Sequence, residues 1–284
     1  MKSLLALIDA SLYAQSVCDH AAWASKQTGA TIELVHVLGR REGQGVPADY
    51  SGNLTLDTKD ALLSELAELD LQRAKLSQKR GRMILDEARA RMTENGVTQI
   101  TTKLRNGDLL DTVAELERDA DLILIGKRGE AADFARLHLG SNLERVVRSS
   151  HKPVLVASRA FRPIKRFLIA YDGGATTMKA VDYIARSDLF AGLECHLLTV
   201  GSDTTDQRRK IEDAERLLKA GSYDVEAKII PGQPEAIISQ TIERDGIDLL
   251  VMGAYSHSRI RSLFIGSTTT EMVRSCKVPV LLVR

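Results

Sequence analysis

The chain contains one sequence pattern twice, and this repeat constrains its fold more than any other feature. Each copy has a short apolar run that ends in glycine, Asp121 to Gly126 in the first and Asp248 to Gly253 in the second. A loop follows in each copy, and then a Gly-Ser pair that begins at Gly140 or Gly266. A buried strand, a glycine-containing loop and a capped helix, in this order, can bind a phosphate group.

The spacing of corresponding residues indicates a tandem duplication. Asp9 and Asp172 are 163 positions apart, whereas Gly126 and Gly253 are 127 positions apart. A net excess of about 36 residues in the first half, between Val37 and Gly107, accounts for the difference, and we place the insertion at about 39–81. The chain is therefore expected to hold two copies of one domain, the first with a helical insertion.

Length and composition agree with two globular domains. The 284 residues are 44% hydrophobic, which is enough for each domain to bury its own core. We expect the first domain at residues 1–157 and the second at 165–284, joined by a short linker. Strand-like apolar runs alternate with helical periodicity in both halves, which predicts an α/β fold of two doubly wound domains with five-stranded parallel sheets.

Charge and cysteine content exclude several classes of protein. The 39 basic and 38 acidic residues leave a net charge of +1, which argues against nucleic acid or an anionic membrane as partners. The apolar run within Met1 to Asp9 is too short for a signal peptide, and no apolar run of the chain approaches membrane-spanning length. Without a signal peptide, a cytoplasmic location is expected. Cys18, Cys195 and Cys276 form no CxxC pair, so we expect three buried thiols and no metal site.

The insertion begins with a loop rich in glycine and proline and continues as a long helix, expected from Lys59 to about Glu94. Leucines stand at positions 62, 63, 66, 69 and 71 of this helix. It is either an amphipathic cover packed on its own domain or a docking surface for a second protomer, as in a homodimer, or for a regulatory protein partner.

The motif after each fourth strand resembles that of the universal stress protein family in its tandem-domain form. The family pattern is Gly, two residues, Gly, nine residues, and Gly followed by Ser or Thr, with an Asp at the end of the first strand. The resemblance covers essentially the whole chain outside the insertion. It implies strand order 3-2-1-4-5, fifth strands side by side in a pseudo-dimer, and, in ATP-binding members, a site between strands one and four. Open α/β sheets place ligands at such switch points on independent grounds.

The resemblance implies an adenine nucleotide, ATP with Mg²⁺, as the ligand. Asp172 would accept a hydrogen bond from the adenine amino group, and Val200 would contact the base. Gly253 and Gly266 would let the backbone approach the ribose and the phosphates. The other expected site residues of the second half are Ala170, Tyr171, Met252, Tyr255, Ser256, Ser267 and Thr268, and those of the first half are Asp9, Val37, Gly126, Arg128, Gly129, Gly140, Ser141 and Asn142.

The two copies depart from the family pattern in different ways. In the first half, ten residues instead of nine separate Gly129 from Gly140, and nearby acids partly cancel the charge of Lys127 and Arg128. In the second half, the nine-residue spacing holds but Ser256 replaces a glycine. Serine keeps its backbone N–H, whereas an extra residue changes the path of the loop, so we rank the second-half site above the first.

Simpler roles compete with nucleotide binding. Ser141 and Thr268 each precede a glutamate by three residues, so their hydroxyls could serve only as capping boxes of their helices. Asp9 and Asp172 could likewise serve only to form turns.

Three classes of function follow from these features. The favoured one is a cytoplasmic, stress-linked regulator that binds ATP and needs no catalytic residue. The second is an interaction scaffold, or a binder of another small ligand, with degenerate nucleotide sites. The third is a slow ATPase or a nucleotidyl or phosphoryl transferase, for which the candidate groups are His257, Arg259 and His138. Neither glycine loop is followed by a Walker lysine.

Overall fold

The structure is a computed structural model that describes residues 1–39, 56–130, 141–254 and 267–284. The first half contains β1 (Ser3–Leu7), α1 (Ala14–Thr28), β2 (Thr31–Leu38), α3 (Leu56–Glu94), β3 (Ile100–Asn106), α4 (Leu109–Leu116), β4 (Leu122–Gly126), α5 (Ser141–Ser149) and β5 (Val154–Ala157). The second half contains β6 (Arg166–Ala170), α6 (Ala175–Ala185), β7 (Glu194–Val200), α7 (Thr205–Ala220), β8 (Val225–Ile230), α8 (Pro234–Arg244), β9 (Leu249–Gly253), α9 (Ser267–Ser275) and β10 (Val280–Val283).

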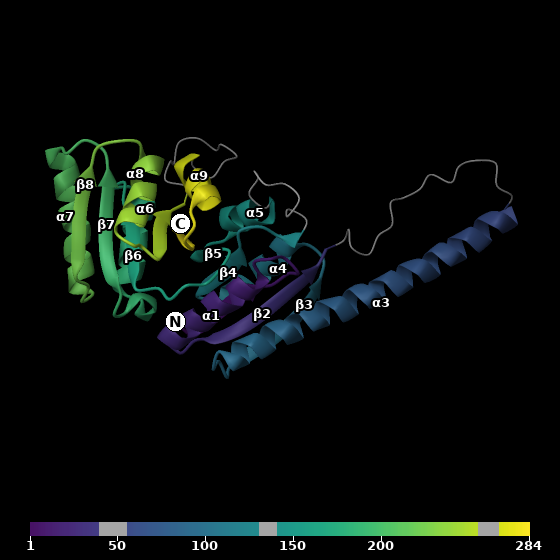
Figure 1. Cartoon of the computed structure of the whole chain (residues 1–284). Helices are drawn as coiled ribbons and strands as arrows, with labels where there is room; N and C mark the ends of the chain where they lie inside the picture. The colour runs from purple at the N-terminus through teal and green to yellow at the C-terminus, as the bar shows by residue number, and fades with distance from the viewer. Residues whose placement is uncertain (40–55, 131–140, 255–266) are drawn as a thin grey trace.

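The strands of the described ranges form one sheet in the order β3-β2-β1-β4-β5-β10-β9-β6-β7-β8. Each half therefore has the predicted order 3-2-1-4-5, which confirms the doubly wound α/β fold. The fifth strands β5 and β10 pair antiparallel, with Val280 opposite Val156 and Leu282 opposite Val154. This pairing makes the two halves a pseudo-dimer within one chain (Figure 1).

Local sequence determines where several helices begin and end. Asp108 caps α4 because its side chain accepts a 2.7 Å hydrogen bond from the N–H of Leu110, and Thr204 caps α7 in the same way. Pro234 occupies the first turn of α8, where its missing N–H costs nothing. Gly29 ends α1 with φ of 69°, a left-handed conformation that glycine adopts without strain.

The core consists of two apolar layers, one on each face of the sheet, and both layers extend across the two halves. One includes Leu4 and Leu124 of the first half with Phe167 and Phe190 of the second. The other includes Ile123 of the first half and residues such as Leu250 and Met272 of the second. Since both layers are continuous from one half to the other, we expect the chain to unfold in one cooperative transition.

The linker between the halves packs on α1. The hydroxyl of Ser16 donates a 2.7 Å hydrogen bond to the carbonyl oxygen of Ser158. The ring of Phe161 lies edge-on to the buried ring of His20, with 5.0 Å between their centroids. Burial lowers the pKa of His20, whose Nδ1 is 2.7 Å from the carbonyl oxygen of Ser16.

Acidification should cost the wild-type chain more stability than it costs a His20→Gln variant. The folded state holds His20 neutral, whereas the unfolded state takes up a proton below the ordinary pKa of 6.5. The contribution of His20 is therefore fully present above that value and is lost as the pH falls through the lowered pKa of the folded state. Urea unfolding of both proteins at about pH 7.5 and about pH 5.5 measures this effect. An equal loss in both proteins would show that His20 is not the acid-sensitive group.

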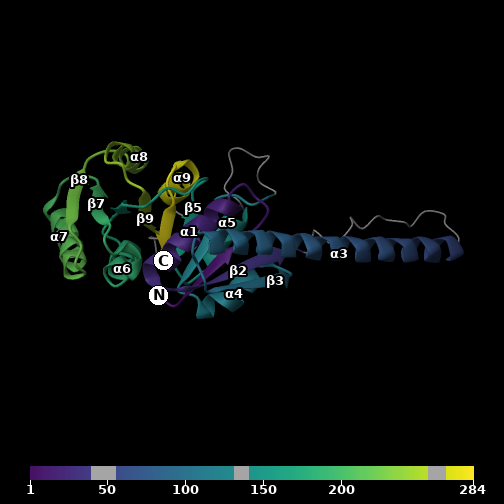
Figure 2. The same ribbon diagram turned by 60° about the horizontal axis from the view of Figure 1, so that its bottom comes forward.

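Among the described residues of the long helix α3, those that pack on the first domain lie in its C-terminal part. Gly81 allows close contact with β3, because an added Cβ would lie 2.7 Å from Cδ1 of Leu104. Beyond it, Leu85, Ala88 and Met92 are buried, and further hydrogen bonds join α3 to α1. The preceding residues extend away from both domains (Figures 1 and 2). The interpretation of the whole helix as a packed cover is therefore wrong for its N-terminal half.

In the described ranges, no helix combines the length and the apolar character needed to cross a membrane.

Candidate functional site

Several of the expected second-half site residues lie at the switch point of the sheet, where strand order reverses between β6 and β9. Ala170 at the end of β6 pairs with Met252 of β9, and Gly253 ends that strand beside it. Val200 ends the other neighbour of β6, strand β7. Because parallel strands present their carboxyl ends at one edge, these residues and Asp172 lie at the same edge of the sheet.

Asp172 starts the turn that leads into α6. Its Oδ1 accepts hydrogen bonds from the N–H of Gly174 at 2.8 Å and from the hydroxyl of Thr177 at 2.6 Å. The predicted turn-forming role of this carboxylate is therefore real. Its Oδ2 has no hydrogen-bond partner in the part of the chain that the structure describes, and the residue is exposed. One oxygen holds the turn and the other can accept a bond from a ligand.

Asp9, the first-half counterpart, uses both of its oxygens. Oδ1 accepts a 3.0 Å bond from the N–H of Ser11, and Oδ2 accepts a 3.2 Å bond from the N–H of Glu130, beyond β4. An added Cβ on Gly129 would lie 3.1 Å from the same Oδ2. A ligand amino group at Asp9 would have to share a carboxylate oxygen with a backbone N–H of the protein. This geometry favours the second-half site, and the ranking of the two halves stays a prediction.

The strand-end glycines have a packing role that the sequence pattern did not indicate. An added Cβ on Gly126 would lie 2.7 Å from Cβ of Tyr13, just before α1. On Gly253 it would lie 2.9 Å from Cγ2 and 3.1 Å from the backbone N of Thr177, in the first turn of α6. Both glycines thus allow a helix start to approach a strand end. The room expected at Gly253 for a ribose is occupied in part by α6.

Thr268 does not form the predicted capping box. Helix α9 begins one residue earlier, and the hydroxyl of Thr268 donates a 2.6 Å hydrogen bond to Oε1 of Glu235 at the start of α8. Glu271 instead forms an ion pair with Arg274. The bond from Thr268 holds the pKa of Glu235 below its ordinary value, so a carboxylate stands beside the start of α9. A phosphate there would meet backbone N–H groups but also this negative charge.

Lys127, expected among the cations of the first-half loop, points elsewhere. Its ammonium is buried and donates a 2.6 Å hydrogen bond to the carbonyl oxygen of Cys276 in the second half. Burial lowers the pKa of Lys127 to about 8. The lysine therefore joins the two domains at the end of α9, where a cation is favourable, and is not available to a phosphate.

The other predicted residues are only partly accounted for. Tyr171 is buried next to the end of β6, Val37 is half-buried on β2, and Asn142 is exposed on α5. Arg128 lies just beyond β4, and Ser141 and Ser267 begin α5 and α9. Four predicted site residues and the catalytic candidates lie outside the described residues: Gly140, Tyr255, Ser256, Gly266, His138, His257 and Arg259.

The cysteines are buried, as predicted. Desolvation raises the pKa of the Cys18 and Cys195 thiols to about 12, so they stay protonated at neutral pH. Among the described residues, no group of three or more His, Cys, Asp or Glu side chains is arranged to hold a metal ion.

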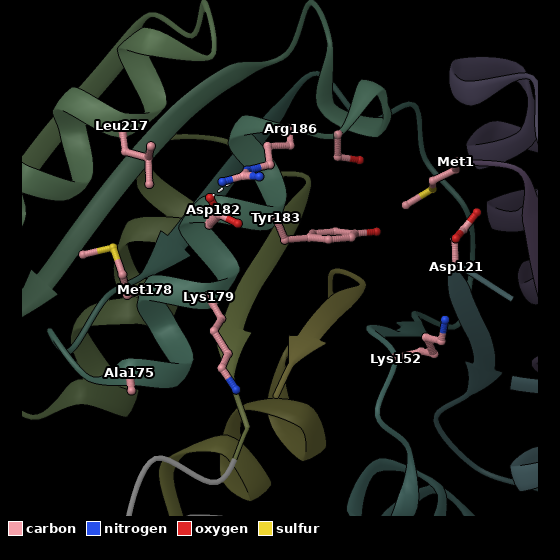
Figure 3. Close-up of a pocket in the computed structure, with 11 residues that line it drawn as sticks. Met1, Asp121, Lys152, Ala175, Met178, Lys179, Asp182, Tyr183, Arg186 and Leu217 are labelled. Carbon is pink, nitrogen blue, oxygen red and sulfur yellow. Dashed lines mark hydrogen bonds and ion pairs between the residues drawn. The ribbon is translucent and has the colours of Figure 1, made fainter. Parts of the chain in front are cut away.

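A pocket of about 810 Å³ lies between the halves (Figure 3). Met1, Asp121 and Lys152 line it from the first half, and α6 lines it from the second. Tyr183 of α6 points across it toward Met1 and Asp121. None of the predicted site residues lines this pocket.

The fold and its two switch points define a tandem α/β protein whose halves share one sheet. The sequence model of the universal stress protein family matches residues 1–158 and 163–284. The chain belongs to this family.

The chain is similar to several known proteins. Universal stress protein Slr1230 of Synechocystis is 37% identical over 287 residues, covering 100% of both chains. The crystal structure of a universal stress protein from Archaeoglobus fulgidus matches 99% of this chain and 95% of its own, with 20% identity and a TM-score of 0.74, which supports the fold. A universal stress protein solved in complex with cAMP matches 43% of this chain and 98% of its own, at 22% identity and a TM-score of 0.38.

Proposed function

We propose that this protein is a cytoplasmic stress-response regulator that binds ATP at the switch point of its second half. The observation that carries the proposal is the carboxylate of Asp172. It stands exposed at the end of β6, between the ends of β7 and β9, with one oxygen that no described residue occupies. Family membership supports the same assignment.

The residues at this edge match the parts of an adenine nucleotide. Oδ2 of Asp172 can accept a hydrogen bond from the adenine amino group, and the apolar side chain of Val200 offers contact to the base. The first turn of α9 presents backbone N–H groups toward the phosphates. The charge of Glu235 opposes a phosphate at this point, and the Mg²⁺ that ATP carries would offset it.

The two aspartates give a matched test of the proposal by thermal unfolding. ATP with Mg²⁺ at a hundredfold excess over its dissociation constant should stabilise the wild type by about 2.7 kcal/mol. Asp172→Asn keeps an oxygen for the turn but replaces the ligand-accepting oxygen by an amide, so the shift should largely disappear. Asp9→Asn is the control and should keep the full shift, because both oxygens of Asp9 already bind the protein.

Two results of this experiment would count against the proposal. A wild type that does not respond to ATP would favour the scaffold class of function. Equal loss of the shift in both variants would refute the ranking of the two halves.

Hydrolysis of ATP is expected to be very slow, in keeping with a regulator. In the second-half loop sequence, His257 is the residue suited to act as a general base near neutral pH. Incubation with ATP and measurement of released phosphate should give a turnover far below about one per second. A faster turnover that His257→Ala abolishes, while ATP still binds, would make the protein an enzyme.

A further inference from the structure

Within the part of the chain that the structure describes, the leucines of residues 62–79 of α3, the α3 arm, are not packed on either domain. Leu63, Leu69, Leu71 and Leu76 are each about half to two-thirds exposed, at 56%, 47%, 62% and 66%. Contact with the domain is seen at Arg80, which forms an ion pair with Glu130, and at Gly81, and the arm extends from the body in both views (Figures 1 and 2). Single exposed leucines are ordinary on protein surfaces, whereas several on one projecting helix call for a partner.

The apolar residues of the arm follow a coiled-coil spacing. Leu62, Leu69, Leu76 and Met83 recur every seven residues. Leu66, Arg73 and Arg80 alternate with them, so that the steps along the helix are four and three residues. We call this row of seven side chains the seam. It has the a and d spacing of a two-stranded coiled coil, with leucine at d and two arginines at a. Leu71 lies on the opposite side of the helix.

The charges of the helix are divided along its length. From residue 57 to residue 70 there are five acidic residues and one lysine. From residue 73 to residue 82 there are five basic residues and no acidic one: Arg73, Lys75, Lys79, Arg80 and Arg82. Two such helices attract each other when antiparallel and repel when parallel, since only the antiparallel arrangement places the acidic part of one beside the basic part of the other.

We propose that the α3 arm pairs with the α3 arm of a second copy of this chain as an antiparallel two-stranded coiled coil. The two-fold axis crosses the seam at the level of residue 71 along the helix. About this axis, the seam of one copy is in register with the seam of the other. Leu66 then faces Leu76 of the second copy, and Leu69 faces Arg73 of the second copy. Outside the seam, Glu65 faces Lys79 of the second copy.

The charged seam positions fit this arrangement. Arg73 lies 3.7 Å from Asp70 of its own helix and, at the axis, would also meet Asp70 of the second copy. Arginine at a positions lowers stability but restricts the pair to two strands in one register. The interface uses the same surface on both copies and therefore closes at a dimer. This association goes beyond nucleotide binding and does not depend on it.

Two exposed leucines of the full-length chain provide the first test. Leu76→Asn alters the seam, whereas Leu71→Asn alters the opposite side of the same helix at nearly equal exposure. Sedimentation over a range of concentrations should show a wild-type dimer, an unchanged dimer for Leu71→Asn, and an association at least about tenfold weaker for Leu76→Asn. Circular dichroism checks that both variants keep the fold.

Cysteine cross-linking tests the direction of pairing. A mixture of Glu65→Cys and Lys79→Cys proteins should form the mixed disulfide on oxidation, and each variant alone should form little. The native cysteines are buried and do not compete. A wild type that stays monomeric at every concentration, an equal effect of the two leucine variants, or ready cross-linking of Glu65→Cys with itself would overturn the proposal.

Discussion

Phe167→Ala is expected to lower the free energy of unfolding by about 4 kcal/mol, because it removes a fully buried ring and leaves a cavity. Phe167 lies on β6 in the apolar layer that both halves share. Its ring centroid is 4.8 Å from that of Phe190 and 5.9 Å from that of Tyr223, in geometries that add to simple burial. Urea unfolding at pH 7 measures the loss.

Phe161→Ala is the matched control for this substitution. Phe161 is only half-buried and contacts His20 from the linker, so its removal should cost less than half as much. Both variants should still unfold in one transition, since the damaged layer belongs to both halves. Separate transitions for the two halves would contradict the shared core, and equal losses would contradict the central place of Phe167.

Gly221→Ala should cost about 3 kcal/mol, the upper end of the range for overpacking. Gly221 ends α7 with φ of −80°, a backbone conformation that any residue can adopt, so backbone strain does not explain the expected loss of stability. The reason is contact with α6. A Cβ would lie 2.6 Å from the carbonyl oxygen and 2.9 Å from Cα of Ala185, and backbone atoms cannot rotate away. Chemical unfolding compares this variant with the wild type.

Gly39→Ala is the control, since an added Cβ there meets no atom within 4 Å. It should leave the free energy of unfolding nearly unchanged. Similar losses in both variants would show that the cost at Gly221 does not come from its contact with α6.

Much of the fold could be predicted because its strands are short apolar runs in a repeated order. The strand β8, Val225–Ile230, and the helix α8, Pro234–Arg244, have the bounds that the sequence indicates. Helical periodicity in the sequence continues from Thr176 to Ala191, but α6 ends at Ala185 and is followed by a 3-10 turn, Asp188–Phe190. The hydroxyl oxygen of Ser187 accepts a hydrogen bond from the N–H of Leu189 and so caps that turn. This local bond separates the turn from α6.

The site was less accessible to sequence reasoning because distant residues decide what its side chains contact. Lys127 looks like a loop cation, yet its partner, the carbonyl oxygen of Cys276, is 149 residues away. Thr268 looks like a helix cap, yet it bonds to Glu235 on another helix. Comparison of the two sequence copies identifies the strands that end at the switch point. It does not identify contacts between the copies.

The α3 arm shows the same limit from another side. Its leucines could be recognised in the sequence, but whether they face the domain or solvent depends on where packing begins. Gly81 lies at that point, where the absence of a side chain allows α3 to approach Leu104 and His36 closely. Once this boundary is known, the division of charge along the exposed part of the helix can be used to infer how two copies of the chain associate.

The nucleotide site is tested most directly by calorimetric titration of ATP with Mg²⁺ into the full-length protein, which gives stoichiometry and affinity together. Our account predicts one ATP per chain, bound at least about tenfold more weakly by Asp172→Asn than by the wild type or Asp9→Asn. Absence of binding heat at several temperatures, or two equal sites per chain, would contradict it.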